Sequence, residues 1–375
     1  MQEVVQDLAQ WWREDRTVGM ATVVAAYRSA PRPPGASLLV GPDGEVVGSV
    51  SGGCVEGAVY EAACEVASSG RPTIERYGVS DDDAFAVGLT CGGTLEIFVE
   101  AVSRKTFPEL GSIAEDIESG RPVAVATVIE CADPELVGRR LVVRPESAAG
   151  SLGSAQLDAV LTADVRGVLA AGRTCVLSYG PQGQRTGHGL RVFVSTAAPP
   201  PRLIVFGAID FAAALTQVGS FLGYRVTVCD ARALFATARR FPFADDVVVD
   251  WPHRYLTGEA VAGRIDGRTA IAVLTHDPKF DVPLLEVALR LPEVGYLGAM
   301  GSRRTHSDRT QRLREAGVTE AELARLSSPI GLDLGARTPQ ETAISIVAEI
   351  IAGSQGGSGR RLGAQDGPIH RLPIA

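Results

Sequence analysis

The sequence predicts an α/β protein with an N-terminal mixed α+β domain and a C-terminal Rossmann-like domain containing a doubly wound parallel sheet. Beyond residue 203, short apolar runs alternate with helical stretches, as in buried parallel strands joined by helices. Before residue 197, strands and helices follow one another without that alternation. A proline run within residues 197–201 separates the two patterns and predicts a stiff spacer. We therefore expect domains at residues 1–196 and 203–352, a linker at 197–202 and a disordered tail at 353–375.

The first half opens with a helix over residues 3–13, because its apolar side chains recur at helical spacing. Strands are predicted where β-branched and small apolar residues gather, and residues 28–35, with three prolines, must form a loop. A helix of small residues over 55–68 and another over 107–119 interrupt the strands. Gly70-Arg71-Pro72 and Gly120-Arg121-Pro122 each end a helix and start a strand. The predicted strands are 18–27, 37–40, 45–50, 72–77, 94–102, 122–130, 139–143, 173–179 and 191–195.

The second half contains five short apolar runs that read as parallel strands. Thr338 and Glu341 form a capping box with Pro339 at the first helical position, which predicts a last helix over residues 339–351. The tail after it is rich in Gly, Ser and Arg. The five predicted strands are 203–206, 225–230, 246–250, 269–275 and 295–300.

Composition indicates a soluble globular protein, with 45% hydrophobic and 21% charged residues. A net charge of −8 argues against general nucleic-acid binding. No apolar run is long enough to span a bilayer, and no basic leader precedes an apolar core. The six cysteines form no C-x-x-C pair, which indicates reduced thiols, no metal site and a cytoplasmic protein.

Two glycine–cysteine runs, residues 48–58 and 90–94, carry most of the chemical information. Each places backbone amides beside a thiol, and the first opens a helix, whose N-terminus lowers thiol pKa values and attracts anions. We therefore expect Cys54 to be the most reactive thiol and a candidate catalytic group, with Cys91 second and Cys229 inert in a strand. A tight turn around a buried cysteine explains either run alone, but both runs, with Asp81-Asp82 between them, favour a functional site.

The chain resembles the XdhC/CoxI family in motifs that recur in one order along it. In the first half these are Pro33-Pro34-Gly35-Ala36, the 48–58 run, Tyr77-Gly78, Asp81-Asp82 and Gly88-Leu89-Thr90-Cys91-Gly92-Gly93. In the second half they are Val205-Phe206-Gly207-Ala208, Cys229-Asp230-Ala231-Arg232, Thr275-His276-Asp277, Gly298-Ala299-Met300-Gly301-Ser302-Arg303-Arg304 and residues 329–339.

The resemblance implies an accessory factor for xanthine dehydrogenase and related molybdenum hydroxylases such as carbon monoxide dehydrogenase. Such a factor would bind molybdenum cofactor, assist its sulfuration and deliver it to an apo-hydroxylase, with a cysteine desulfurase as a further partner and a homodimeric state. The six cysteines lack the close spacing that iron–sulfur clusters need, so the chain is not a complete xanthine dehydrogenase.

We expect the cofactor in a cleft between the domains. Thiols and amides suit its metal–sulfur end, while arginines at a helix start capped by Ser302 suit its phosphate. The N-terminal candidates are Gly52, Gly53, Cys54, Glu56, Asp81, Asp82, Cys91, Gly92 and Gly93. The C-terminal candidates are Gly207, Asp230, His276, Ser302, Arg303, Arg304, Asp333 and Arg337.

The first βα turn of the Rossmann-like domain keeps only half of the dinucleotide fingerprint. Ile209 replaces the second glycine, and Asp210 adds a negative charge where a pyrophosphate would approach. Asp230, after the second strand, stands where a ribose would be held. An NAD(P)-linked oxidoreductase is therefore a disfavoured alternative, with close packing of helix against strand the favoured explanation of Gly207 and Ala212. A protein-interaction scaffold is the third possibility.

Overall fold

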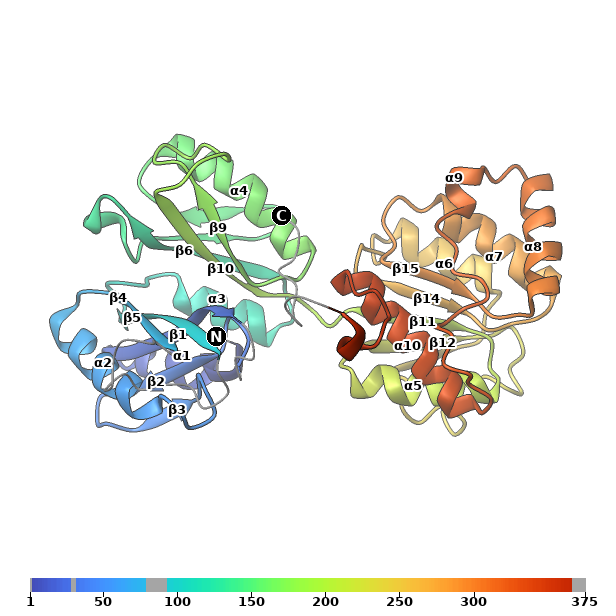
Figure 1. Ribbon diagram of the computed structural model, residues 1–375, viewed down its shortest axis with the longest axis horizontal. Coiled ribbons are helices and arrows are strands. Elements are labelled where there is room, and N and C mark those ends of the chain that lie inside the picture. The colour runs from blue at the N-terminus through green and yellow to red at the C-terminus, as the bar shows by residue number, and fades with distance from the viewer. Residues whose placement is uncertain (1, 28–31, 79–92, 366–375) are drawn as a thin grey trace. The chain divides into compact units, whose positions relative to one another are not determined.

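The computed structural model describes residues 2–27, 32–78 and 93–365, which form two compact units divided between Pro199 and Pro200 (Figure 1). The predicted fold class is confirmed: unit 1 mixes helices with antiparallel sheets, and unit 2 contains a parallel sheet with helices on both faces. In the predicted linker region, four residues separate strand β10 (Leu190–Ala197) from strand β11 (Arg202–Phe206).

Sheet A of unit 1 has the strand order β3-β2-β1-β5-β4. Its strands are β1 (Val18–Tyr27), β2 (Ser37–Val40), β3 (Val46–Gly48), β4 (Thr73–Gly78) and β5 (Thr94–Val102). Helix α2 (Glu56–Ser69) packs on one face of this sheet, with Val59, Ala63 and Val66 buried against β1 and β5. The predicted strands 18–27, 37–40 and 94–102 agree with the structure residue for residue, because each is one continuous run rich in apolar residues and is buried over most of its length.

Sheet B repeats this arrangement with the order β8-β7-β6-β10-β9. Its other strands are β6 (Val123–Cys131), β7 (Arg140–Val143), β8 (Ala148–Gly150) and β9 (Cys175–Tyr179). Helix α4 (Ala155–Ala170) covers it, and neither this helix nor β8 nor the 3-10 turn Pro134–Leu136 is among the predicted elements. Helices α1 (Val5–Arg13) and α3 (Leu110–Glu118) contribute to the core that also holds residues of both sheets.

The two sheets of unit 1 are structural repeats of each other. In sheet A, Thr22 pairs with Ser37 and Phe98, and in sheet B, Thr127 pairs in the same way with Arg140 and Phe193. Gly48 and Gly150 end equivalent strands, each with a positive φ and with a backbone carbonyl too close for a Cβ atom. The repeat also relates Gly70 to Gly172, and not to Gly120 as the repeated Gly-Arg-Pro motif suggests.

Equivalent residues of the two repeats meet between the sheets. Phe98 and Phe193 share one apolar cluster, and Arg191 donates a 2.5 Å hydrogen bond to the equivalent residue, Glu96. Contact between equivalent residues is expected near a pseudo-two-fold axis. Unit 1 is therefore two related halves that face each other across β5 and β10.

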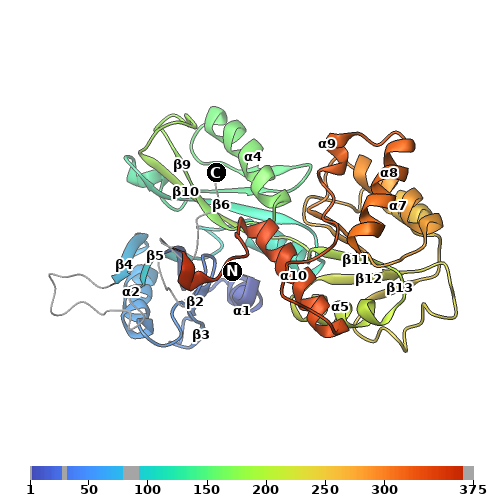
Figure 2. The same cartoon turned by 45° about the vertical axis from the view of Figure 1, so that its right-hand side comes forward.

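Unit 2 is a five-stranded parallel sheet with the order β13-β12-β11-β14-β15. After β11, its strands are β12 (Arg225–Cys229), β13 (Asp246–Val248), β14 (Ala270–Val273) and β15 (Tyr296–Ala299). Helices α5 (Asp210–Phe221) and α10 (Pro339–Gln355) lie side by side on one face (Figures 1 and 2). The opposite face is covered by α6 (Pro252–Val261), α7 (Pro278–Arg290) and α8 (Arg303–Glu315), beside the short α9 (Glu320–Leu323).

The end of unit 2 differs from the expectation. The last helix begins at Pro339 with the predicted capping box but runs to Gln355, beyond the predicted Ile351. A 3-10 turn, Leu362–Ala364, follows within the segment expected to be a disordered tail. Leu332 packs closely beside Gly359, which gives this segment a partner in the loop before α10.

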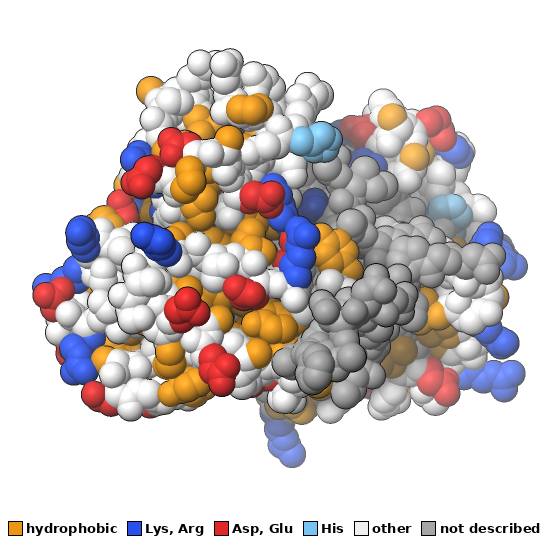
Figure 3. Space-filling view, turned by 60° about the vertical axis from the view of Figure 1, so that its left-hand side comes forward, with side chains coloured by type: hydrophobic (Ala, Val, Ile, Leu, Met, Phe, Trp, Pro, Cys, Tyr) orange, Lys and Arg blue, Asp and Glu red, His pale blue; other side chains and the backbone are white. Residues whose placement is uncertain are grey.

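Within the described residues, no helix combines the length and apolar character needed to cross a membrane. On the face drawn in Figure 3, acidic and basic side chains of the described residues are interspersed, without one dominant charge. Such a surface provides little of the concentrated basic field that nucleic acids require.

Candidate functional site

The first glycine–cysteine run forms a loop that closes on the carboxylate of Glu56. This carboxylate accepts hydrogen bonds from the amides of Ser51 (2.9 Å), Gly53 (2.8 Å) and Val55 (3.2 Å). It also accepts from the hydroxyl groups of Ser49, at 2.7 Å, and Ser51. The amides that the sequence suggests for an external anion are therefore already bonded to a side chain of the same loop.

The remaining amides of the loop are bonded as well. Gly52 donates to the Ser49 hydroxyl and Cys54 to the Ser51 hydroxyl, each at 3.0 Å. Burial alone would raise the pKa of Glu56, but the hydrogen bonds from Ser51 and Ser49 lower it to about 2. Glu56 is thus a charged structural centre of the loop at neutral pH.

Cys54 lies two residues before α2, as the sequence predicts. It is half-buried and packs against the core under sheet A, whereas Cys64 on the same helix is exposed. Burial raises the pKa of Cys229 to about 12, which agrees with an inert thiol. The greater reactivity of Cys54 stays a prediction. Cys64 is the more exposed of the two thiols, so it is the one that competes with Cys54 for a labelling reagent.

The structure describes only some of the other N-terminal candidates. Gly52 and Gly53 are exposed with positive φ angles, so the loop brings them together with Cys54 and Glu56. Gly93 is buried immediately before β5. Asp81, Asp82, Cys91 and Gly92 lie outside the described residues.

In unit 2, several candidates gather at the carboxyl ends of the parallel strands, where open α/β sheets bind ligands. Gly207 follows β11 with φ +113°, and a Cβ atom there would lie 3.0 Å from the Thr275 amide nitrogen. Close approach of the loop after β14 therefore requires this glycine. This is a packing role, although its partner is a loop and not the expected helix.

Asp230 directly follows β12, as predicted, but its carboxylate is already engaged. It accepts 2.7 Å hydrogen bonds from the Ala208 amide and from Nη2 of Arg232, and 2.9 Å bonds from the Arg232 amide and Nε. Burial would raise the pKa of Asp230, but these donors hold it below its usual value. A ribose would have to displace Arg232 to reach this carboxylate.

The charge beside the first turn also differs from the sequence interpretation. Arg240 pairs with Asp210 at 3.2 Å and donates to the Ala208 carbonyl at 3.1 Å. Arg232 and Arg240 both lie over the ring of Phe235. Because Arg232 is already paired with Asp230, Arg240 is the guanidinium that partly offsets the charge of Asp210.

A buried network connects the loops after β14 and β15. Arg309 of α8 donates to the Asp281 carboxylate at 2.9 Å and to the Met300 carbonyl at 2.7 Å. Thr275 donates to the other oxygen of Asp281. This network fixes the backbone beside His276, which is exposed, and beside Ser302.

Ser302 caps α8 as predicted, accepting from the Thr305 amide at 3.1 Å. Arg303 and Arg304 follow it in the first helical turn and are exposed, with no ion-pair partner among the described residues. Asp333 and Arg337 are exposed in the loop before α10. Among the described residues, no cluster of three His, Cys, Asp or Glu side chains is placed to hold a metal ion.

Sequence reasoning missed the residues that organise these sites. Arg232 and Arg309 are revealed only by the carboxylates that they reach, because arginines on a helix or loop carry no signal of their partner. A second omission is Glu100 with Arg140, a buried ion pair beside a pocket of about 330 Å³ in unit 1. Two glutamates on one face of an apolar strand, Glu96 and Glu100, are the signal that could have found it.

Two family descriptions match the chain. The XdhC and CoxI family matches residues 11–78 and 116–180, and the XdhC Rossmann domain matches residues 203–350. A Bacillus subtilis protein named as a probable xanthine dehydrogenase subunit is 28% identical over 88% of this chain and 92% of that protein. "Molybdenum cofactor insertion chaperone PaoD" of Escherichia coli is 28% identical over 89% of this chain and 82% of that protein.

A crystal structure titled as a xanthine dehydrogenase from Bacillus halodurans has a TM-score of 0.64 and 26% identity, covering 97% of each chain. The family matches include parts of both units of the fold. The chain belongs to the XdhC and CoxI family.

Proposed function

We propose that this chain binds molybdenum cofactor and assists its insertion into a molybdenum hydroxylase of the xanthine dehydrogenase type. The observation that carries the proposal is the similarity, over 89% of the chain, to a relative named as a molybdenum cofactor insertion chaperone. The label xanthine dehydrogenase on other relatives fits an accessory protein, since the six cysteines lack the spacing of iron–sulfur ligands.

The carboxyl edge of the parallel sheet supports binding of the cofactor phosphate. Arg303 and Arg304 are exposed at the start of α8, where the helix dipole adds to their charge. Arg232 lies on the same edge, although Asp230 occupies much of its guanidinium. A phosphate monoester would find charge there without needing the ribose-binding carboxylate.

Sulfuration is the finer part of the proposal. Cys54 is the candidate sulfur carrier, because its loop holds it before the helix while Gly52 and Gly53 leave the approach exposed. A cysteine desulfurase would then be a transient partner. Homodimerisation and a cytoplasmic location belong to the same proposal.

Purified from a host that makes molybdenum cofactor, the protein is expected to carry molybdopterin, measurable as its fluorescent oxidised derivative. The isolated chain is expected not to turn over xanthine, because it lacks the ligands of an electron-transfer chain. Preparations without molybdopterin, or with xanthine turnover, would contradict the proposal. The matched control is the same protein from a host unable to make the cofactor.

NAD and NADP are expected to bind weakly, which argues against an oxidoreductase. The Ala208 amide and the Asp230 carboxylate, which would meet a dinucleotide, are bonded to each other, and Ile209 blocks the backbone. Calorimetric titration should show no micromolar affinity, and the double variant Ile209→Gly with Asp210→His should improve any residual binding. Micromolar affinity in the unmodified protein would restore the oxidoreductase hypothesis.

A further inference from the structure

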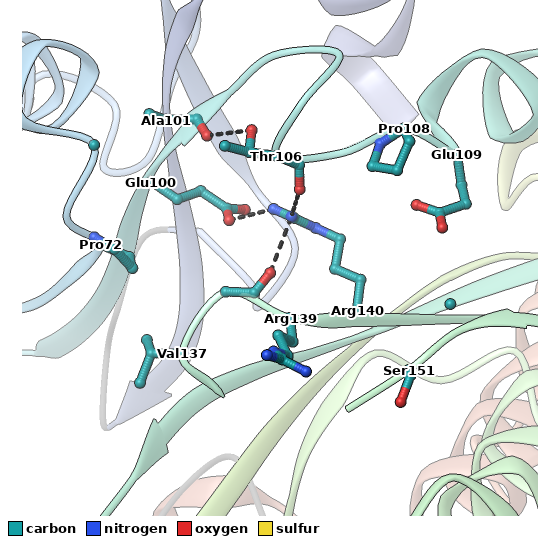
Figure 4. A pocket seen from close by; sticks show the side chains of 13 residues that line it. Pro72, Glu100, Ala101, Thr106, Pro108, Glu109, Val137, Arg139, Arg140 and Ser151 are labelled. Atoms are coloured by element: carbon teal, nitrogen blue, oxygen red, sulfur yellow. Dashed lines mark hydrogen bonds and ion pairs between the residues drawn. The ribbon is translucent and has the colours of Figure 1, made fainter. Parts of the chain in front are cut away.

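The pocket beside Glu100 lies where the two repeats of unit 1 differ. Residues of both sheets line it, with Glu100 from β5 and Arg140 from β7 at its centre (Figure 4). The equivalent positions in the other half, by strand register, are Ser195 and Ser37. Ser37 bonds to Thr22 and to the Gly35 carbonyl, each at 3.2 Å. The same scaffold therefore closes with short hydroxyl side chains, and the fold does not require the charged pair.

The ion pair is built rigidly but leaves one acceptor available. Arg140 donates to the carbonyl groups of Thr106 (3.0 Å) and Gly138 (3.1 Å), and its guanidinium stacks 4.1 Å from the Phe107 ring centre. It also bonds to Oε2 of Glu100. The Glu100 side chain is only 7% exposed, yet no group among the described residues donates to its Oε1. Oε1 is not among the fully buried atoms that lack a hydrogen-bond partner, so it stays open to a donor from water or from a ligand in the pocket.

The pocket walls favour a flat, polar heterocycle. Figure 4 shows Pro72 and Val137 on one side of the ion pair, with Pro108 and Ser151 on the other. A volume of about 330 Å³ stands at the lower end of the range of small-molecule sites, about 300–1,000 Å³. Glu109 and Arg139 add one charge of each sign, so a neutral ring with donors and acceptors fits better than an ion.

We propose that this pocket binds the 2-amino-4-oxopyrimidine edge of a pterin through Glu100. The adjacent ring N–H and amino group of that edge donate in parallel, one to the open Oε1 of Glu100 and one to the second lone pair of Oε2, beside its bond from Arg140. Guanine presents the same edge, so purine and pterin must be distinguished by experiment. The assignment to a pterin rests on the proposed function, because molybdenum cofactor contains one.

The test is a fluorescence titration of the full chain with neopterin, with guanosine, and with lumazine, which lacks the amino group. Neopterin should bind saturably, and lumazine at least about tenfold more weakly, the cost of one charge-assisted hydrogen bond. The Glu100→Gln substitution should weaken the affinity for neopterin by a similar factor. Tighter binding of guanosine than of neopterin would assign the site to a purine and overturn the pterin assignment.

Glu96→Gln is the matched control. Glu96 shares the strand, face and burial of Glu100, but both its oxygens are paired, with Arg76 at 3.0 Å and Arg191 at 2.5 Å. It does not line this pocket, so its variant should bind neopterin like the unmodified protein. If Glu100→Gln fails to fold, Ser151→Trp at an exposed wall position should block neopterin instead. The proposed pterin site would be wrong if all folded variants bound neopterin equally, or if both glutamate variants lost neopterin binding to the same extent.

Molybdopterin content separates this inference from the proposed function. If the protein carries no co-purified molybdopterin but still binds neopterin through Glu100, the pterin site is supported and the cofactor role is rejected. If the Glu100→Gln variant carries as much molybdopterin as the unmodified protein, the cofactor role is supported and the pterin site at Glu100 is rejected.

Discussion

Replacing Arg309 by methionine is expected to lower the free energy of unfolding of unit 2 by about 3–5 kcal/mol, because it leaves Asp281 buried without its cation. Both side chains are almost fully buried, at 3% and 4% exposure, and their charged atoms lie 2.9 Å apart. For a unit of this size the loss corresponds to roughly 10 °C in melting temperature. Calorimetry or circular dichroism of the purified variant would measure it.

The pH dependence of this variant identifies the cause. Burial holds the pKa of Asp281 above its usual value even though Thr275 and Arg309 lower it, and removing Arg309 should raise it further. When a carboxyl group has a higher pKa in the folded state than in the unfolded state, the folded protein becomes more stable as the pH falls, because the group takes up a proton. The variant should therefore be more stable at pH 5 than at pH 8, relative to the unmodified protein.

Two further variants control for this result. Arg314 lies on the same helix as Arg309 and forms an exposed pair with Glu320 of α9, so Arg314→Met should cost at most about 1 kcal/mol. Adding Asp281→Asn to Arg309→Met should recover part of the loss by removing the buried charge. A melting temperature unchanged in Arg309→Met, or a loss that grows at low pH, would show that the Asp281 charge is not the cause.

Local sequence patterns predicted most of the strands because their signals lie within single runs. The β5 strand is buried on both faces, with Leu95 and Ile97 in the core beside α2 and Phe98 in the cluster shared with β10, and its predicted bounds agree with the structure. Helix α4 also carried a readable signal, an N-cap at Ser154 and apolar residues every fourth position from Leu157. The predicted elements nevertheless include no helix between the strands at 139–143 and 173–179, so α4 is absent from the expectation.

The repeat in unit 1 could not be inferred from composition or short motifs. Equivalent residues lie at unequal separations along the chain, and the obvious Gly-Arg-Pro repetition at Gly70 and Gly120 joins non-equivalent positions. Strand register reveals the relation, because Thr22 and Thr127 occupy the same place in two sheets. The asymmetry that defines the pocket, Glu100 against Ser195, becomes visible only after this alignment.

The candidate sites show a similar limit. Spacing placed Cys54 before a helix and Asp230 after a strand, and both positions are correct. Spacing cannot state which acceptor takes a loop amide or which donor takes a carboxylate. Glu56 and Arg232 filled these roles from within the chain, so the groups expected to meet a ligand were already bonded.

Replacing Glu56 by glutamine is expected to destabilise unit 1 by about 2 kcal/mol, roughly 4–8 °C in melting temperature. The neutral amide is a weaker acceptor for the amides of Ser51 and Gly53, and its NH2 group faces donors that it cannot accept from. Glu61→Gln, at an exposed position of the same helix, is the matched control and should leave the melting temperature unchanged.

The dependence on pH and the state of Cys54 make this prediction specific. Because the folded-state pKa of Glu56 is about 2 against an ordinary value of 4.5, its stabilisation is complete above pH 4.5 and is lost as the pH falls toward 2. The difference between the two proteins should therefore shrink over that interval. Loosening the loop should also speed alkylation of Cys54 without affecting Cys229, which lies buried in the other unit. Unchanged alkylation in a destabilised variant would show that Glu56 supports the fold without holding the thiol loop in place.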